Sequence, residues 1–388
     1  MNRPFNGFVR DASPVPVGSV DISLESDSSP SHQDNNNDVD KLPNERYYAG
    51  LEGGASSSKV AIIRGDGEIM SIVQDGLPST NMLLVGEKEC QRRIVEFIDK
   101  AKKAANLPSR LTLDGLGLCL SGCENSNINN RFKKSLMENY PNLTRSCSIE
   151  SDTIGSIMTA APTGGIVIIA GTGSNCLLLN PNGERNQCGG WGYILGDEGS
   201  AYRIALQVIK TVIDHEEGLC PSKDPIDRAK KAIYDYFKIR RPIEMYEHIY
   251  VNFDKSYLAG VCASLAKEAR EGDPLLCKVF QKAGTELAMH IRALLPNVDE
   301  TLLKNRKPLI IACVGSVFKS WPLLQKGFVP ILEDKGMPLN LVQLRRPAAI
   351  GAAYLAAKDA GYHLPMDFRE NWEILAQIGV EKSNQSKN

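Results

Sequence analysis

The sequence predicts an α/β protein made of two duplicated halves, and two observations support this fold class. First, residues 52–68 align without a gap on residues 168–184, with Ser56 on Thr172. Each copy is an apolar strand, a turn of Gly, Ser and Thr, a second apolar strand and a tight turn. Second, strand-like and helix-like segments alternate along the rest of the chain, which is typical of α/β proteins.

Short apolar runs and helical periodicity give the order of the elements. The runs 166–170 and 309–314 have the length of buried strands, and Gly and Pro residues near 221–225 and 272–274 break the helical stretches. The last helix is rich in Ala and Gly, which suits close packing. We expect, in order, a hairpin (47–75), a helix (86–105), a buried strand (115–120), a helix (132–139), a short strand (147–150), a helix (153–161), the second hairpin (166–184), two largely helical stretches (198–220 and 225–295), a buried strand (309–314) and a small-residue helix (347–360).

The bulk composition is ordinary for a folded protein. The chain has 388 residues, enough for two domains, of which 42% are hydrophobic and 23% charged. The formal net charge of −1 gives no indication of a nucleic-acid or membrane partner. No apolar run approaches the roughly 18–20 residues of a membrane span.

Cysteine and histidine usage argues against a zinc site. The ten cysteines form no CxxC pair, and the five histidines form no HExxH motif. Several cysteines lie inside apolar strand-like runs, where Cys behaves as a small buried hydrophobe. A chain of this size with no recognisable signal peptide fits a reducing compartment, so we expect a cytoplasmic protein.

Residues 1–45 differ from the rest in composition. They contain eight acidic and three basic residues and are rich in Ser, Asn and Pro. Such a segment cannot bury enough apolar surface to offset the entropy cost of ordering, so we expect a disordered acidic tail. Organellar targeting peptides are poor in acids and rich in Arg, which only the first twenty residues weakly resemble. After the tail we expect an N-terminal domain over 46–162, a C-terminal domain over 163–370 whose last helix could pack back on the first domain, and a flexible tail over 371–388.

The two hairpin turns are candidate phosphate-binding loops. Small residues let backbone N–H groups and hydroxyls approach a phosphate closely, so the repeat suggests a nucleotide held between the halves. The β- and γ-phosphates would be bound with Mg²⁺ bridging them, and Glu52 could hold the metal through water. The alternative is two ordinary hairpins with glycine at their tips, with Glu52 a solvated turn carboxylate. The loop residues expected to bind the nucleotide are Gly54, Ser56, Gly171, Thr172 and Gly173.

Asp152 is a candidate general base. It follows a predicted strand and opens a helix, where the helix dipole keeps a carboxylate ionised. That position suits a base that accepts a proton from a sugar hydroxyl attacking phosphorus. The alternative is structural, because Asp is also a favoured helix N-cap.

A second group of loops could contact a sugar or a nucleoside. In Gly189–Gly192, glycines flanking Trp191 let the backbone pass close to a ligand, and Asp197 could accept hydrogen bonds from sugar hydroxyls. The alternative is a surface loop in which Trp191 is a packing anchor and Asp197 a helix cap. Asn81 and Ser121 follow strands and are lesser candidates. Gly315-Ser316 could contact the adenine or ribose, or be a plain strand-to-helix turn.

Seven segments in order resemble eukaryotic N-acetyl-D-glucosamine kinases. The resemblance runs from about Tyr47 to Asp367, and these proteins have the sugar kinase, Hsp70 and actin fold. That fold has two ribonuclease-H-like domains with a nucleotide in the interdomain cleft, and the repeated hairpins would be its phosphate loops. The segments are GLEGGASSSK, SIESDTIGSIMTA, IAGTGSNC, CGGWGYILGDEGSAY, FDKSYLAGVC, CVGSVFKSW and LRRPAAIGAAYLAA.

The resemblance implies ATP-dependent phosphorylation of N-acetyl-D-glucosamine at the 6-hydroxyl in amino-sugar salvage, by a cytoplasmic homodimer using Mg²⁺. It implies that Asp152 is the catalytic base and that Ser56 and Thr172 supply phosphate-loop hydroxyls. Ala259 and Gly315 match adenine-side positions. The first loop departs from the family's usual Gly-Gly-Gly-Thr, since it has Ala55 before Ser56. Residues matching the sugar pocket are Asn81, Ser121, Gly190, Trp191, Gly192 and Asp197.

Three other functions remain open at this stage. The first is phosphorylation of another amino sugar, such as N-acetylmannosamine or glucosamine. The second is an ATPase activator of acyl-CoA reductases, which resembles the same superfamily and holds an iron–sulfur cluster between subunits through paired cysteines. The third is a catalytically silent sugar sensor. A sugar-responsive repressor of this fold would need an added DNA-binding domain, and the acidic tail is too short and of the wrong charge.

Overall fold

The computed structural model describes residues 42–54, 57–123, 125–333 and 336–379. Most of the predicted acidic tail, and with it residues 1–41, lies outside these ranges, as do Ser56 of the first loop and residues 380–388 of the predicted flexible tail. No helix within the described ranges is both long enough and apolar enough to span a membrane.

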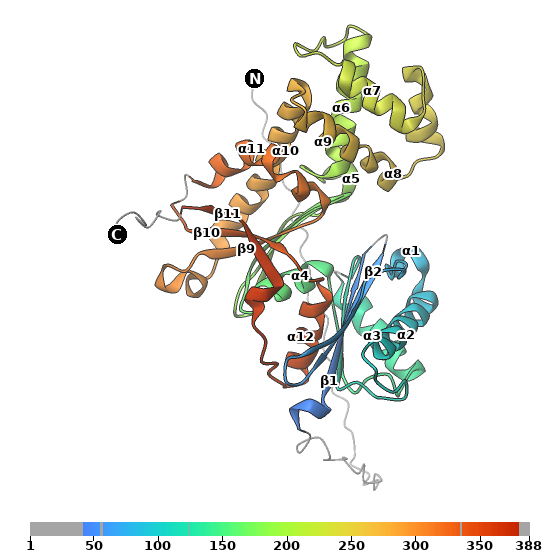
Figure 1. The fold of residues 1–388 in the computed structure, drawn as a ribbon, viewed down its shortest axis with the longest axis vertical. Coiled ribbons are helices and arrows are strands. Elements are labelled where there is room, and N and C mark those ends of the chain that lie inside the picture. Colours follow the sequence, from blue (N-terminus) through green and yellow to red (C-terminus); the bar gives the residue numbers. More distant parts are fainter. Residues whose placement is uncertain (1–41, 55–56, 124, 334–335, 380–388) are drawn as a thin grey trace, which may run out of the picture. The chain divides into compact units, whose positions relative to one another are not determined.

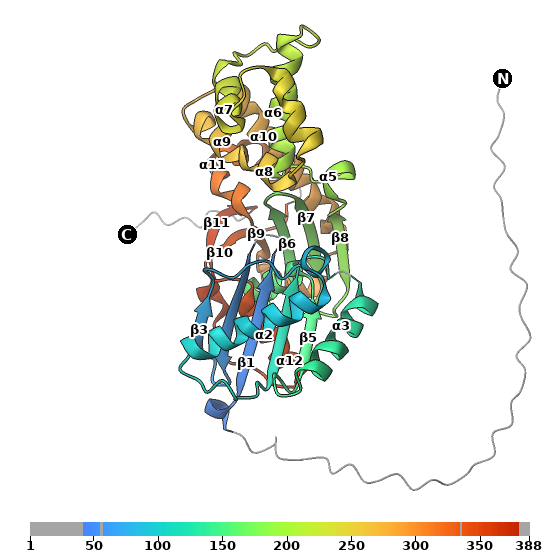
Figure 2. The same cartoon turned by 90° about the vertical axis from the view of Figure 1, so that its right-hand side faces the viewer.

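The first sheet contains five strands in the order β3-β2-β1-β4-β5 (Figure 2). β1 is antiparallel to β2 and parallel to β4, and β4 is parallel to β5. Buried aliphatic residues on these strands explain why they pair, since both faces are covered. The strands are β1 (Tyr47–Gly53), β2 (Ser58–Arg64), β3 (Ile69–Val73), β4 (Gly115–Leu120) and β5 (Cys147–Glu150).

The second sheet repeats this order with one additional strand. Its order is β11-β10-β9-β6-β7-β8, in which β6 corresponds to β1, β7 to β2 and β9 to β4. β6 is antiparallel to β7 and parallel to β9, as in the first sheet. The duplication seen in the hairpins therefore extends to the whole sheet. The strands are β6 (Gly165–Ala170), β7 (Ser174–Leu179), β8 (Arg185–Gly189), β9 (Leu309–Val314), β10 (Leu339–Leu344) and β11 (Trp372–Ile378).

Helices cover both sheets. In the first half, α2 and α3 place their apolar residues against the strands, and in the second half α6, α10 and α11 do so. The helices are α1 (Met82–Val85), α2 (Glu87–Ala104), α3 (Ser126–Asn139), α4 (Asp152–Ala160), α5 (Gly192–Leu195), α6 (Ala201–Glu216), α7 (Asp227–Phe237), α8 (Lys255–Gly260), α9 (Cys262–Arg270), α10 (Pro274–Leu294), α11 (Trp321–Glu333) and α12 (Ala349–Asp359). Short segments of 3₁₀ or π helix lie at Pro43–Glu45, Pro242–Glu244, Glu247–Val251, Leu295–Asn297, Glu300–Arg306, Ser316–Ser320 and Phe368–Asn371.

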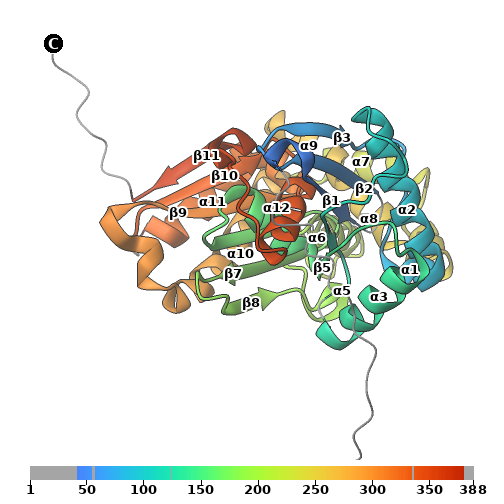
Figure 3. The same cartoon turned by 90° about the horizontal axis from the view of Figure 1, so that it is seen from below.

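The helices α4 and α12 lie between the two sheets (Figures 1 and 3). The small residues of α12 pack on β1, β2 and β4, and α12 also contacts α4 along its length. Apolar residues of α4 pack in turn on the second sheet, where Ile157 meets Val167 and Ala312. The two halves are therefore connected through a pair of closely packed helices.

The predicted fold class is confirmed, and several elements match their predicted bounds. β4, β5 and β9 have the bounds expected from their apolar runs, and α2 and α4 differ by one residue at each end. The sequence analysis did not predict α11 or β10. The proposed division near residue 162 falls in the turn between α4 and β6.

The prediction of a flexible tail over 371–388 is wrong for residues 372–378. These residues form β11, which pairs antiparallel with β10 at the edge of the second sheet. The Trp372 indole N–H also donates to the Ala160 carbonyl at 3.1 Å. The segment is ordered by backbone pairing with a distant strand, which its own half-exposed sequence does not reveal.

The contact between α12 and β4 leaves no room for a side chain at Gly117, and this can be tested. A Cβ atom there would lie 1.9 Å from the Ala352 carbonyl oxygen. We expect Gly117→Ala to lower the free energy of unfolding by about 3 kcal/mol, because backbone must move. Denaturant unfolding measures this. Gly361→Ala is the control: its Cβ meets open space and carries only the positive-φ strain, about 1 kcal/mol. Equal losses in the two variants would contradict the crowding.

Candidate active site

The candidate site lies where three parallel strands of the first sheet end. The carboxyl ends of β1, β4 and β5 meet at one edge of the sheet, which is where open α/β sheets commonly bind ligands. The residues that follow these ends include Gly54, Ser121 and Asp152. Three predicted site residues, far apart in sequence, are therefore brought together by the sheet topology.

Asp152 is a half-buried carboxylate that accepts a hydrogen bond from one hydroxyl. The Ser121 hydroxyl donates a hydrogen bond to Asp152 Oδ2. Burial raises the pKa of Asp152, although the bond from Ser121 acts in the opposite direction. Asp152 is the first residue of α4 and Ser151 occupies the N-cap position, so the alternative of Asp152 as the N-cap is wrong.

The first predicted phosphate loop is tied to the same group of residues. The Ser121 N–H donates to the Gly53 carbonyl at 2.8 Å, and the Ser79 hydroxyl donates to the Gly54 carbonyl at 2.8 Å. The Asn81 N–H in turn donates to the Ser79 hydroxyl at 3.0 Å. The Asn81 side-chain oxygen caps α1. Gly54, Asn81, Ser121 and Asp152 thus form one connected group.

Besides the predicted binding of a metal ion, Glu52 makes two contacts within the protein. One carboxylate oxygen lies 3.3 Å from the Lys59 ammonium, and the other accepts the Ala348 N–H at 2.9 Å, at the start of α12. Within the described ranges no three His, Cys, Asp or Glu side chains cluster to hold a metal ion. Mg²⁺ usually takes only one or two carboxylates besides phosphates and waters. One carboxylate at the end of β1 therefore fits such an ion.

The second predicted phosphate loop turns between β6 and β7. The Gly171 N–H donates to the Gly173 carbonyl at 2.9 Å, which leaves Thr172 at the tip. Behind the loop lies the buried Asp197, whose Oδ1 accepts the Ser174 N–H at 3.0 Å. A Cβ atom on Gly173 would lie 2.7 Å from that same Oδ1, so this position needs glycine.

Asp197 is paired with a cation that the sequence analysis did not select. Its Oδ2 lies 2.7 Å from the Lys255 ammonium. The alternative of Asp197 as a helix cap is wrong, since the Ser200 side chain caps α6. Asp197 adopts φ +67°, an uncommon conformation for a non-glycine residue. Its backbone is therefore shaped around the pair with Lys255 and the bond to Ser174.

The predicted adenine-side residues meet at a cavity of about 290 Å³. Ala259 and Ser316 both line it, together with Gly260 and Ala201. The cavity adjoins the second loop, because the Ala201 N–H donates to the Gly171 carbonyl at 2.9 Å. Gly315, directly before Ser316, packs against Ala170 and Gly171.

The Trp191 loop is shaped by glycine. Gly190 and Gly192 adopt φ of +78° and +74°, a region open to glycine and strained for other residues. The Trp191 side chain is 74% exposed, so the alternative of a packing anchor is wrong. A Cβ on Gly190 would lie 2.6 Å from Gln187 Nε2, which places this loop over the Gln187 side chain.

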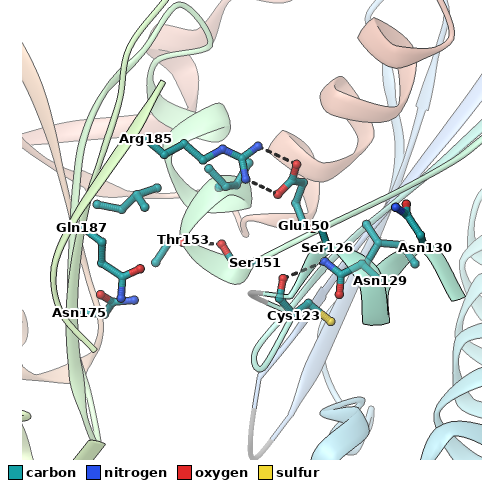
Figure 4. A pocket seen from close by; sticks show the side chains of 13 residues that line it. Cys123, Ser126, Asn129, Asn130, Glu150, Ser151, Thr153, Asn175, Arg185 and Gln187 are labelled. Atoms are coloured by element: carbon teal, nitrogen blue, oxygen red, sulfur yellow. Dashed lines mark hydrogen bonds and ion pairs between the residues drawn. The ribbon is translucent and has the colours of Figure 1, made fainter. Parts of the chain in front are cut away.

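A cavity of about 350 Å³ lies at the start of α4 (Figure 4). It is lined by Ser151 and Thr153, which flank Asp152, and by Asn175 and Gln187 from the second sheet. The Asn175 side-chain oxygen is buried and finds no hydrogen-bond partner among the described residues. A buried acceptor of this kind usually has a partner, which here would be a ligand donor.

An ion pair joins the two halves at this cavity. Arg185 of β8 donates two hydrogen bonds of 2.7 Å to Glu150 of β5 (Figure 4). Sequence reasoning missed Arg185, Glu150, Asn175 and Gln187. Only Asn175 had a signal, since it directly follows the second loop. Arg185 and Glu150 lie on different sheets, so their spacing in the sequence gave no sign that they form an ion pair.

The predicted residues therefore form two groups. One is Gly54, Asn81, Ser121 and Asp152 on the first sheet. The second sheet carries the other, in which Gly171 to Gly173, Asp197 and Gly315 lie together. Between the described residues of these two groups no hydrogen bond or ion pair is formed. A ligand that touches both groups would have to bridge the two halves.

The duplicated sheets with paired hairpin loops define an α/β protein of the actin and sugar-kinase fold. Residues 49–356 match the BadF/BadG/BcrA/BcrD ATPase family, and the chain belongs to that family.

Curated relatives agree with this assignment. An N-acetylmuramic acid/N-acetylglucosamine kinase of Clostridium acetobutylicum is 24% identical over 322 residues, covering 81% of this chain and 99% of the relative. A glucosamine kinase of Vibrio cholerae is 29% identical over 177 residues, which cover 45% of this chain and 57% of the relative. An N-acetyl-D-glucosamine kinase of Dictyostelium discoideum is 26% identical over 182 residues, which cover 45% of this chain and 56% of the relative.

A solved structure supports the fold. A candidate N-acetylglucosamine kinase from Chromobacterium violaceum superposes with a TM-score of 0.62 at 22% identity, covering 80% of this chain and 98% of the other. At that identity the similarity establishes the shared fold.

The raised pKa of Asp152 predicts a pH-dependent cost in stability. The folded state favours the protonated Asp152 carboxyl more than the unfolded state does, so the protonated group stabilises the fold at low pH. That stabilisation is lost as the pH rises through the pKa that Asp152 has in the folded state. We expect Asp152→Asn, which keeps an acceptor for Ser121, to melt at a higher temperature than the wild type at pH 8. The difference should shrink towards pH 4. Thermal unfolding at both pH values tests this. A variant that is less stable at pH 8 would contradict the burial cost.

Proposed function

We propose that the protein transfers the γ-phosphoryl group of ATP to the 6-hydroxyl of N-acetyl-D-glucosamine. The products are ADP and N-acetylglucosamine 6-phosphate. The observation that carries the proposal is the half-buried Asp152, held by Ser121 at the carboxyl edge of the first sheet. Membership of an ATPase family and the amino-sugar kinases among the relatives support it.

In this proposal Asp152 is the general base. Its carboxylate accepts the proton of the 6-hydroxyl as the oxygen attacks the γ-phosphorus, and the bond from phosphorus to the bridging oxygen of ADP breaks. A raised pKa makes the carboxylate a stronger base, because proton transfer is most effective when the pKa approaches the working pH. Ser121 fixes the orientation of the carboxylate. Exclusion of water is needed as well, since water would otherwise hydrolyse ATP.

The sugar would lie in and beside the cavity of Figure 4. The unpartnered oxygen of Asn175 can accept an N–H from the nitrogen at carbon 2 of an amino sugar. Among the amino sugars we propose N-acetylglucosamine, because it is named for two of the relatives. The residues proposed to contact the sugar are Asn81, Ser121, Gly190, Trp191, Gly192 and Asp197.

The nucleotide would lie along both loops with its adenine in the cavity lined by Ala259 and Ser316. Gly54 and Ser56 of the first loop, and Gly171 to Gly173 of the second, would bind the phosphates. Mg²⁺ would neutralise charge on the β- and γ-phosphates when bound, with Glu52 holding it through water. A eukaryotic-type homodimer acting in cytoplasmic amino-sugar salvage completes the proposal.

The reaction is tested by measuring ADP release with Mg·ATP and a panel of sugars. We expect the highest turnover with N-acetylglucosamine, against N-acetylmannosamine, glucosamine, glucose and no sugar. Asp152→Asn should reduce turnover by about 10²–10⁴-fold while sugar binding remains. Asp235→Asn, at an exposed aspartate on α7, makes the same change of charge and is the matched control.

Each other outcome points to a different function. A preference for N-acetylmannosamine or glucosamine would keep the reaction class and change the substrate. ATP hydrolysis without sugar dependence, in a coloured protein, would favour the activator class. Sugar binding without turnover would favour a sensor. Full turnover by Asp152→Asn would remove the base from the mechanism.

The exposed Trp191 provides a direct report of sugar binding. Its side chain is 74% exposed, whereas Trp321 is 9% exposed. If the loop covers the sugar, N-acetylglucosamine should shift tryptophan emission to shorter wavelength and protect it from acrylamide quenching. Trp191→Phe should abolish both changes. An unchanged spectrum at saturating sugar, with binding verified by calorimetry, would exclude Trp191 from the sugar contact.

A further inference from the structure

Lys255 occupies a distinctive place at the second loop. It is the first residue of α8, and its side chain is 28% exposed. A Cβ on Gly173 would lie 3.0 Å from the Lys255 ammonium, so the cation lies directly against the loop. The ammonium is also 5.8 Å from the centre of the Tyr193 ring, in the helix that follows Trp191.

Among the described residues, the acidic group that pairs with this ammonium is Asp197, at 2.7 Å. Asp197 is 3% exposed and also accepts the Ser174 N–H from the loop. A carboxylate with two oxygens can keep the bond to Ser174 on one while releasing Lys255 from the other. The pair can therefore open without loss of the loop's anchor.

The helix that carries Lys255 also reaches the cavity proposed for adenine. Ala259 and Gly260 of α8 line that cavity, and a helix rises about 6 Å over the four residues from Lys255 to Ala259. The cavity adjoins the second loop through Ala201. One short helix thus borders both the cavity and the loop.

We propose that Lys255 binds the nucleotide phosphates and exchanges Asp197 for them when the nucleotide arrives. A phosphate chain carries more negative charge than one carboxylate and attracts an ammonium more strongly. Asp197 Oδ2 is then free to accept a hydroxyl of the second substrate. This last step rests on the proposed function, which places Asp197 in the sugar pocket. Nucleotide and sugar binding are thereby coupled, and the coupling is reciprocal.

The test compares ligands that differ only in phosphate number. Calorimetry with adenosine, AMP, ADP and a non-hydrolysable ATP analogue is carried out on the wild type, Lys255→Met and Lys255→Arg. We expect Lys255→Met to lower the affinity for the ATP analogue by at least about tenfold and the affinity for adenosine by less than about twofold. Lys255→Arg should restore most of the affinity. Lys267→Met, an exposed lysine on α9, removes the same charge as a control.

Lys255→Met also leaves the buried Asp197 carboxylate without its cation, which is expected to lower stability. The double variant Lys255→Met, Asp197→Asn removes both charges and keeps an acceptor for Ser174, and it should show the same selective loss for the ATP analogue. An equal loss of affinity for adenosine and for the ATP analogue would mean that Lys255 only holds α8 in place. No loss for either ligand would place the phosphates elsewhere. Both results would overturn the proposal.

The coupling is measured as the affinity for N-acetylglucosamine with and without the ATP analogue. In the wild type the analogue should tighten sugar binding by about fivefold or more, and Lys255→Met should abolish this effect. Tightening that persists in Lys255→Met would overturn the exchange. If no sugar binds at all while phosphate selectivity still depends on Lys255, the phosphate role stands and the proposed substrate fails.

Discussion

The close approach of α12 to the first sheet and to α4 is the constraint on which the site depends. Glycines at positions 50 and 117 let β1 and β4 lie against the α12 backbone. On its other side, the Gly351 N–H donates to the Thr159 hydroxyl of α4 at 2.9 Å. Because Asp152 begins α4, this packing fixes the carboxylate relative to the ends of β1 and β4. Small side chains far from any ligand thus determine the geometry of the site.

The same packing imposes a cost in stability at Asp152. Asp152 is the first residue of α4 and is half-buried, and burial disfavours its charged form. A structure optimised for stability alone would have an uncharged residue there. The single hydroxyl of Ser121 partly offsets the cost and gives the carboxylate one orientation. If Asp152 is the proposed base, this residual destabilisation is the expected trade-off between stability and activity.

The duplication has produced two loops of similar backbone and different electrostatics. Beside the first loop, Glu52 is shared between Lys59 and the start of α12. Beside the second loop, Asp197 is paired with Lys255 from an inserted helical region that has no counterpart in the first half. In the proposed function the second half would supply a cation for the phosphates, and the first half would supply the base. The two halves therefore share a sheet framework and differ in the charged residues beside their loops.

The sequence by itself determined the fold class, the two hairpin loops and the position of Asp152 between a strand and a helix. These depend on local signals: apolar runs of strand length, glycine-rich turns, and a polar residue between a strand and a helix. Tertiary structure alone decided that β11 completes the second sheet, that Lys255 faces Asp197, and that Arg185 meets Glu150 across the cavity. Each of these is a pairing between residues distant in the chain, whose energy depends on distance and burial in the folded state. A single sequence carries no record of those quantities.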